Sequence, residues 1–150
     1  MSGQFRVSTQ HAPQHRHTRI VITLDDGRDL RFLDQRTFGG LTLAPLVDGI
    51  PGPVTHIAPD PFEECFDVDE VVRRLCARRS AIKRSLLDQT LVSGIGNIYA
   101  DETLWRVRCH PETPCSRLSQ SEAVELLQTA CDVMAEAMSQ GGTSFDSLYV

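Results

Sequence analysis

The sequence predicts an α+β protein, with a β-rich segment at residues 1–44 and a helical segment at residues 65–150. Turn signals and β-branched residues concentrate in the first segment, whereas helix-capping patterns and helical spacing of apolar residues concentrate in the second. Five of the eight prolines lie in residues 45–64, between the two segments. Because proline interrupts both helices and sheets, we expect a linker there.

The β-rich segment contains a hairpin pattern. Residues 18–24 are rich in β-branched side chains, residues 25–28 read Asp-Asp-Gly-Arg, and residues 29–33 alternate between polar and apolar side chains. A turn signal between two such runs is typical of a β-hairpin. Residues 38–43 predict a further strand.

The helical segment opens with a capping box. Asp67 is followed three residues later by Glu70, which predicts a helix from there to about residue 77. We expect Ser80 to cap a short helix that ends at residue 87, and Asn97 to cap a third helix that ends before Pro111.

A second capping box, at Ser119 and Glu122, predicts a long helix that Gly141 and Gly142 end. One face of this helix carries apolar side chains at helical spacing: Ala123, Leu127, Ala130, Met134, Ala137 and Met138.

Composition excludes several classes of protein. The chain has 150 residues, of which 41% are hydrophobic and 23% charged, as in ordinary globular domains. No apolar run approaches the ~20 residues of a membrane span, and no secretory signal is seen, so we expect a cytoplasmic protein. The five cysteines form no CxxC pair. They predict free thiols and no cofactor, although Cys109, His110 and Cys115 lie close enough in sequence to suggest a metal.

Charge is unevenly distributed along the chain. The net charge of −5 argues mildly against nucleic acid as a partner. However, residues 71–84 carry six cations and no acid: Arg73, Arg74, Arg78, Arg79, Lys83 and Arg84. This run is either a solvated helical face or a local site for an anion.

Residues 92–97 read Val-Ser-Gly-Ile-Gly-Asn and precede a predicted helix. Gly94 and Gly96 would let the backbone approach a ligand closely, and free amides at a helix N-terminus attract phosphate. Asn97 could cap the helix, donate to a phosphate, or do both, and Lys83 and Arg79 could converge on the same anion. A tight turn without a ligand is the alternative.

These residues carry a resemblance to a known family. Residues 82–89 (IKRSLLDQ) and 92–102 (VSGIGNIYADE) resemble the helix–two-turn–helix core of formamidopyrimidine-DNA glycosylases, the Fpg/Nei family. Residues 1–4 (MSGQ), 15–17 (HRH), 34–39 (DQRTFG) and 141–144 (GGTS) follow the family's order. The resemblance implies a partial β-sandwich in residues 1–44 and a helix–two-turn–helix DNA-binding domain in residues 65–150.

The resemblance also implies roles for single residues in binding double-stranded DNA. In the family, the residues that match Lys83 and Asn97 bind phosphates that flank the lesion, and Gly96 belongs to the same turn. Those that match Met1, Arg36 and Phe38 enter the duplex where the damaged nucleotide has swung out. Two further positions match DNA-contacting residues of the family, namely His15 and Arg79. From the residues alone, Phe38 could instead be a core residue and His15 an ordinary loop residue.

The sequence also departs from the family. The family's catalytic proline and glutamate and its strand-eliminating lysine stand before the position of Met1, and its zinc finger follows the position of Val150. Gln35 replaces a usual proline and Thr37 a usual arginine. We therefore expect a module that binds damaged or abasic DNA without glycosylase activity.

Two alternatives to that function stay open. One is a residual abasic-site lyase that uses an N-terminal amine, because an unblocked α-amine is partly neutral and nucleophilic near neutral pH. The other is a degenerate product with no independent role. An uncovered sheet edge would also favour self-association.

Overall fold

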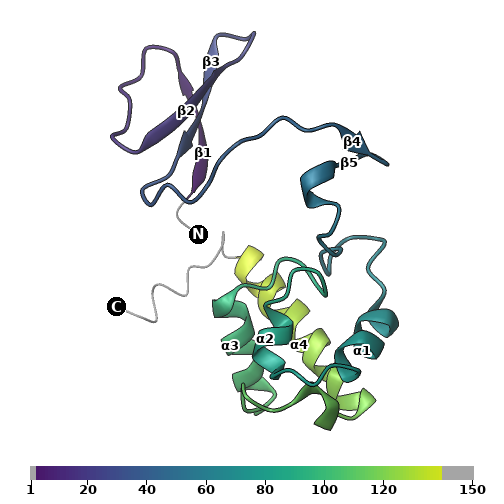
Figure 1. Ribbon diagram of the computed structural model, residues 1–150. Helices are drawn as coiled ribbons and strands as arrows, with labels where there is room; N and C mark the ends of the chain where they lie inside the picture. The colour runs from purple at the N-terminus through teal and green to yellow at the C-terminus, as the bar shows by residue number, and fades with distance from the viewer. Residues whose placement is uncertain (1–2, 140–150) are drawn as a thin grey trace. The chain divides into compact units, whose positions relative to one another are not determined.

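The protein combines an antiparallel sheet with a set of helices, which confirms the α+β prediction (Figure 1). The computed structural model describes residues 3–139. The chain divides into two compact units, Met1–Pro45 and Leu46–Val150. The first unit contains a three-stranded sheet, and the second contains all the helices.

The sheet of the first unit consists of β1 (Gln4–Thr9), β2 (Thr18–Thr23) and β3 (Arg28–Leu33), in the order β1-β3-β2. All pairs are antiparallel, and a bulge interrupts the pairing of β2 with β3 between Thr18 and Ile20. The β2–β3 hairpin confirms the sequence prediction. Gly27 occupies the left-handed region at φ 78° in the turn, where glycine is favoured.

A buried ion pair organises the loop between β1 and β2. Arg31 and Asp29 are 4% and 5% exposed, and the Arg31 Nη2 to Asp29 Oδ2 distance is 3.0 Å. The Arg31 guanidinium also donates to the backbone carbonyl oxygens of Thr9, Ala12 and Pro13. Because all its donors point at oxygen acceptors, this buried cation fixes the course of residues 9–13.

The predicted strand at residues 38–43 is absent from the structure, where this segment is irregular. The buried side chain of Asp34 accepts hydrogen bonds from the backbone amides of Arg36, at 3.1 Å, and Gly39, at 2.8 Å. These bonds curl residues 34–39 into a loop, and Thr37 adopts a left-handed φ of 55°. A Cβ at Gly39 would lie 2.6 Å from the Phe32 ring, so only glycine fits there without a shift.

The second unit begins with a short hairpin of β4 (Leu46–Val47) and β5 (Ile50–Pro51), followed by the 3-10 turn η1 (Gly52–Val54). These elements lie in the stretch for which the sequence predicts a linker. Prolines and glycines limit them to two or three residues each.

The helices are α1 (Val68–Cys76), α2 (Ile82–Leu86), α3 (Asn97–Arg106) and α4 (Gln120–Ser139), with the 3-10 turn η2 (Cys115–Arg117) before α4. The first predicted box is confirmed in its N-cap, because the Asp67 carboxylate accepts from the Glu70 amide at 3.0 Å, but the Glu70 carboxylate accepts from Arg73. The second is confirmed by reciprocal bonds between Ser119 and Glu122. Gly141 and Gly142, the predicted end of α4, lie outside the described residues.

Two predicted caps are wrong. Ala81, not Ser80, precedes α2, and the Ser80 hydroxyl instead pairs with the Ser85 hydroxyl at 2.8 Å. Gly96, not Asn97, is the N-cap of α3, and no side chain caps that helix. Asn97 is therefore the first helical residue, and its side chain is available for another role.

The helical unit has one continuous apolar core. It is built from α1, α2, α3, α4 and the turn residues Leu91, Val92 and Ile95. The predicted apolar face of α4 is buried at every position except Met138, which is 61% exposed. No helix within residues 3–139 is long and apolar enough to cross a membrane.

We predict that Ser119→Ala lowers the free energy of unfolding of the helical unit by about 1 kcal/mol, because it removes the side-chain acceptor for the Glu122 amide. Urea unfolding followed by circular dichroism measures the change. The matched control is Glu125→Ala on the exposed side of α4, which we expect to cost less than about 0.5 kcal/mol. Equal losses in the two variants would contradict the capping role.

Candidate functional site

The turn between α2 and α3 is held by a single side chain. The Gln89 carbonyl oxygen accepts from the Gly94 amide at 3.0 Å. The Gln89 amide nitrogen donates to the backbone oxygens of Leu87, at 3.2 Å, and Ile95, at 3.0 Å. One side chain thus connects the end of α2 to the residue before Gly96, and fixes where α3 begins.

The irregular segment at residues 58–60 supports the same turn through backbone hydrogen bonds. The Ala58 backbone amide donates to the backbone carbonyl of Gln89 at 2.9 Å, and the Ser93 backbone amide donates to the backbone carbonyl of Pro59 at 3.3 Å. Gly94 has a left-handed φ of 84°, and a Cβ there would lie 2.5 Å from Asp60 Oδ2 and 2.8 Å from Met134 Cε. The left-handed backbone at position 94 therefore favours glycine, and a side chain there would have to displace the ends of the Asp60 and Met134 side chains.

Gly96 differs from Gly94 in its backbone conformation and in the space around it. Its φ is −96°, and a Cβ there would meet nothing within 4 Å. Neither backbone conformation nor packing within the described chain demands glycine at this position. The open space in front of Gly96 lies at the N-terminus of α3, where the backbone dipoles favour an anion.

Two of the predicted phosphate ligands converge beside this turn. Lys83 of α2 and Asn97 of α3 both contact the carboxylate of Asp101, one turn further along α3. The Lys83 Nζ to Asp101 Oδ1 distance is 2.6 Å. Asn97 Nδ2 donates to Asp101 Oδ2 at 3.2 Å. The structure therefore brings Lys83, Gly96 and Asn97 into one region, with an acidic residue between the two donors.

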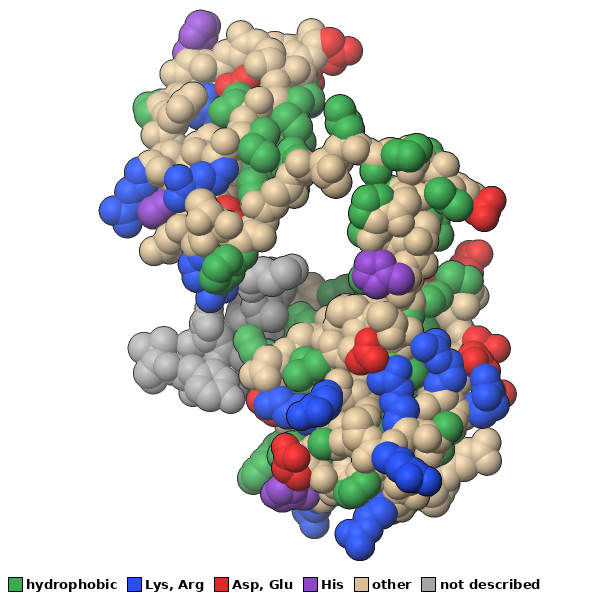
Figure 2. All heavy atoms as spheres, in the orientation of Figure 1, with side chains coloured by type: hydrophobic (Ala, Val, Ile, Leu, Met, Phe, Trp, Pro, Cys, Tyr) green, Lys and Arg blue, Asp and Glu red, His purple; other side chains and the backbone are tan. Residues whose placement is uncertain are grey.

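Most other cations of residues 71–84 have partners inside the protein. Arg73 pairs with Glu70, and Arg74 donates to the Thr90 carbonyl. Figure 2 shows Lys and Arg side chains close together on the visible face of the helical unit, with acidic side chains among them. Over the described part of the chain, Arg79 and Arg84 are exposed and make no hydrogen bond or ion pair. Within residues 3–139, no hydrogen bond or ion pair joins Arg79 to the Lys83–Asn97 cluster.

Arg78 and Asp88 form a structural pair next to the turn. Their side chains approach to 2.6 Å, and the Asp88 carboxylate also accepts from the hydroxyl and backbone amide of Thr90. Hydrogen bonds from the Thr90 hydroxyl and the Arg78 guanidinium lower the pKa of Asp88 to about 2. Arg78 is thus engaged in holding the turn.

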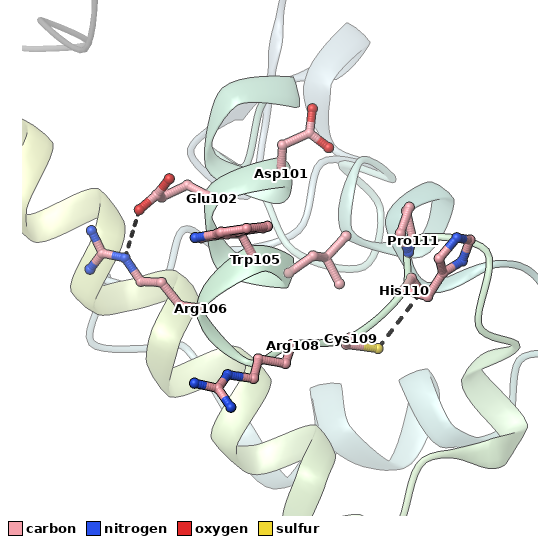
Figure 3. Close-up of a pocket in the computed structure, with 9 residues that line it drawn as sticks. Asp101, Glu102, Trp105, Arg106, Arg108, Cys109, His110 and Pro111 are labelled. Atoms are coloured by element: carbon pink, nitrogen blue, oxygen red, sulfur yellow. Dashed lines mark hydrogen bonds and ion pairs between the residues drawn. The ribbon is translucent and has the colours of Figure 1, made fainter. Parts of the chain in front are cut away.

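A cavity of about 870 Å³ borders Asp101 of the Lys83–Asn97 cluster and extends toward the C-terminal end of α3. Asp101, Leu104, Trp105, His110 and Pro111 line it, and Figure 3 shows Asp101 and Trp105 one turn apart on α3. Trp105 is 80% exposed, which is unusual for the largest apolar side chain. The sequence reasoning did not select Trp105, although its spacing of four residues from Asp101 places both on one helical face.

The other candidates lie in the first unit. Arg36 and Phe38 stand on the loop that Asp34 holds, with the guanidinium carbon 5.3 Å from the ring centroid. Phe38 is 82% exposed, so the alternative of a core residue is wrong.

His15 is exposed and its Nδ1 accepts from the His17 amide at 3.2 Å. The pKa of His17 is lowered by desolvation and by the neighbouring Arg16, His15 and Arg19. Met1 lies outside the described residues.

A metal reading of the cysteines gains no support from residues 3–139, in which no three His, Cys, Asp or Glu side chains gather to hold an ion. The cysteines of this range are free thiols, and burial raises the pKa of Cys76 and Cys131.

The chain matches two family models that together cover most of its length. Residues 1–41 match the formamidopyrimidine-DNA glycosylase N-terminal domain, and residues 57–148 match the formamidopyrimidine-DNA glycosylase H2TH domain.

Curated relatives named formamidopyrimidine-DNA glycosylase align with the whole chain. The one from Rhodococcus jostii is 53% identical over 154 residues, and the one from Mycolicibacterium vanbaalenii is 55% identical over 154 residues. The alignments cover 100% of this chain but 53% and 52% of those proteins. The chain therefore spans about half the length of the relatives it matches.

Solved structures show the same fold. The Lactococcus lactis formamidopyrimidine-DNA glycosylase bound to DNA with an abasic site superimposes with a TM-score of 0.81, at 30% identity over 99% of this chain and 57% of that chain. The complex of the same enzyme with DNA that contains FAPY-dG gives 0.80, at 32% identity over 97% and 55%.

The two glycines of the turn lead to stability losses of different size when each is replaced by alanine. Gly94→Ala should lower the free energy of unfolding by about 2–4 kcal/mol, because it strains the left-handed backbone and collides with Asp60 and Met134. Gly96→Ala should cost less than about 1 kcal/mol. Urea unfolding of both variants measures this difference, and a Gly96→Ala loss as large as that of Gly94→Ala would contradict it.

Proposed function

Because the chain belongs to the formamidopyrimidine-DNA glycosylase family, we propose that its 150 residues bind damaged or abasic duplex DNA. In this proposal Lys83, Gly96 and Asn97 contact backbone phosphates, and the loop with Arg36 and Phe38 fills the space left by a displaced nucleotide. His15, Arg79 and Met1 are further proposed contacts. The protein would act on the chromosome in the cytoplasm.

The observation that best supports the proposal is that Lys83 and Asn97 both contact one carboxylate, that of Asp101. The two side chains come from different helices and direct an ammonium and an amide donor at the same carboxylate. A phosphate oxygen is an acceptor of the same kind, and charge-assisted hydrogen bonds are the strong ones. Gly96 adds open space and a helix N-terminus at the same place.

The loop of residues 34–39 supports the second half of the proposal. Phe38 is exposed and apolar, and Arg36 lies over its ring, so the loop presents a flat apolar group beside a cation. Proteins that kink or open a duplex insert apolar side chains between bases, and an arginine can donate to an unpaired base. Asp34 fixes this loop, and its Arg36 and Phe38 side chains are suited to fill the space left by a displaced nucleotide.

We further propose that these 150 residues bind without releasing a base, because none of them matches the family's catalytic proline or glutamate. Release of free base from a duplex that contains FAPY-dG tests this point, and measurable release would contradict it. Borohydride trapping on an abasic duplex tests the separate alternative of a residual lyase, which predicts a trapped adduct. Self-association through β1 is a separate proposal, supported by Phe5 and Val7, which are 52% and 55% exposed on that strand.

We predict that Lys83→Ala and Asn97→Ala each weaken binding to an abasic duplex about tenfold, since each removes a donor to phosphate. Fluorescence anisotropy at several salt concentrations measures the affinity. Lys83→Ala should also reduce the slope of log K against log salt by about 0.9, because one fewer phosphate is neutralised. Asn97→Ala should leave that slope unchanged, because the amide carries no charge.

Arg117→Ala is the matched control, because it removes an exposed cation of η2 that takes no part in the cluster. We expect it to change affinity less than twofold at constant salt. The proposal fails if the unmodified chain shows no binding to the duplex at low salt, or if Arg117→Ala and Lys83→Ala behave alike.

A further inference from the structure

We propose that Asp101 is a built-in competitor for the anion at the α2–α3 turn. DNA phosphate would then bind there by exchange, displacing the Asp101 carboxylate from Lys83 and Asn97. This inference rests on the proposed function and assigns to Asp101 a role that weakens the grip on DNA. Asp101 was not among the residues selected from the sequence.

The geometry supports competition because one carboxylate occupies both donors at once. One oxygen of Asp101 lies 2.6 Å from Lys83 Nζ, and the other accepts from Asn97 Nδ2 at 3.2 Å. A phosphate that approached Lys83 and Asn97 from the side of Gly96 would present the same arrangement of two anionic oxygens. Two anions cannot share this pair of donors without mutual repulsion.

The position of Asp101 on α3 keeps its carboxylate next to Asn97. Asn97 and Asp101 are four residues apart, so their side chains meet on one face of the helix. Lys83 is held nearby because α2 and α3 share one apolar core, to which Leu86 and Ala100 contribute fully buried side chains. The carboxylate therefore stays within reach of both donors when it is displaced.

Displacement is feasible because the pair is partly exposed. The side chain of Asp101 is 51% exposed and that of Lys83 is 29% exposed. Exposed ion pairs contribute little to stability, and water can solvate the released carboxylate. In Figure 3, Asp101 projects from α3 one turn before Trp105 and borders the cavity, which gives the carboxylate open space.

The opposite role would be positioning, in which Asp101 holds Lys83 and Asn97 ready for DNA. The two roles predict changes of opposite sign. Removing a competitor tightens DNA binding, whereas removing a positioning residue weakens it. The sign of one substitution therefore decides between them.

The test substitution is Asp101→Asn, which keeps the shape and an acceptor oxygen for Asn97 but removes the charge. We expect it to tighten binding to an abasic duplex about three- to tenfold, as loss of one unit of nearby repulsion implies. In the Lys83→Ala background the same substitution should change affinity less than about twofold, because there is no ammonium to release. Fluorescence anisotropy on the four proteins gives the full cycle.

Asp132→Asn on α4 controls for net charge. Asp132 is exposed, and its carboxylate accepts from Gln128 on the same helix. An equal gain in this variant, or an equal gain of Asp101→Asn with and without Lys83, would reduce the effect to overall charge and overturn the proposal. Weaker binding by Asp101→Asn, or an unchanged affinity, would also overturn it. Asp101→Ser, checked by circular dichroism, repeats the test with a smaller side chain.

Titration with inorganic phosphate separates this inference from the proposed function. The readout is the NMR resonance of the Asn97 side-chain amide, followed as phosphate is added. In Asp101→Asn we expect the half-maximal shift at a phosphate concentration about three- to tenfold lower than in the unmodified chain. If the two proteins differ in this way but the chain does not bind duplex DNA, the proposed function is rejected and the competing role of Asp101 for phosphate stands. Equal phosphate titrations in both proteins would reject the competitor itself.

Discussion

The Gln89 side chain donates two hydrogen bonds and accepts one, and these three bonds determine the shape of the α2–α3 turn on which the site depends. They join the end of α2 to Gly94 and Ile95, and so fix the point at which α3 starts. Leu91, Val92 and Ile95 of the same turn are fully buried, so the polar bonds and the apolar core constrain it together. Because Lys83 stands on α2 and Asn97 on α3, their separation follows from this turn rather than from either helix alone.

Electrostatics in this protein is local rather than global. The chain carries a net charge of −5, yet cations gather before and within α2. Arg73, Arg74 and Arg78 satisfy acids or carbonyl oxygens of the helical unit, which consumes half of the cationic run in structural contacts. Lys83 is also paired, to the Asp101 carboxylate, which in our proposal stands where a phosphate would bind. Because Asp101 neutralises Lys83, the local charge beside the turn does not follow from the sum over the chain.

The sequence was most informative where structure follows from neighbouring residues. The β2–β3 hairpin, the Asp67 N-cap and the capping box at Ser119 depend on contacts within a few residues, and each was predicted correctly. The predicted strand at residues 38–43 was wrong because a single buried carboxylate, that of Asp34, captures two backbone amides of the loop. Local alternation of side chains contains no sign of such a bond.

The errors at the site have the same origin. Asn97 was predicted as a possible cap because asparagine before a helix commonly caps it, but Gly96 takes that position and leaves the amide to Asp101. The contribution of Asp101 depends on a lysine eighteen residues earlier on another helix. Gln89 reads as an ordinary polar residue until its three partners are known. Glycines 94 and 96 look alike in sequence, and only the space around each distinguishes a crowded position from an opening for a ligand.

The anchored loop of residues 34–39 has a kinetic consequence. Its shape is already determined in the free protein, because Asp34 is buried and Gly39 packs against Phe32. A preshaped loop loses little conformational entropy when it meets a partner, so its contacts lengthen the lifetime of a complex more than they slow its formation. If the chain binds DNA as we propose, such a loop lets brief encounters end quickly, and residence time then separates a fitting site from other sites.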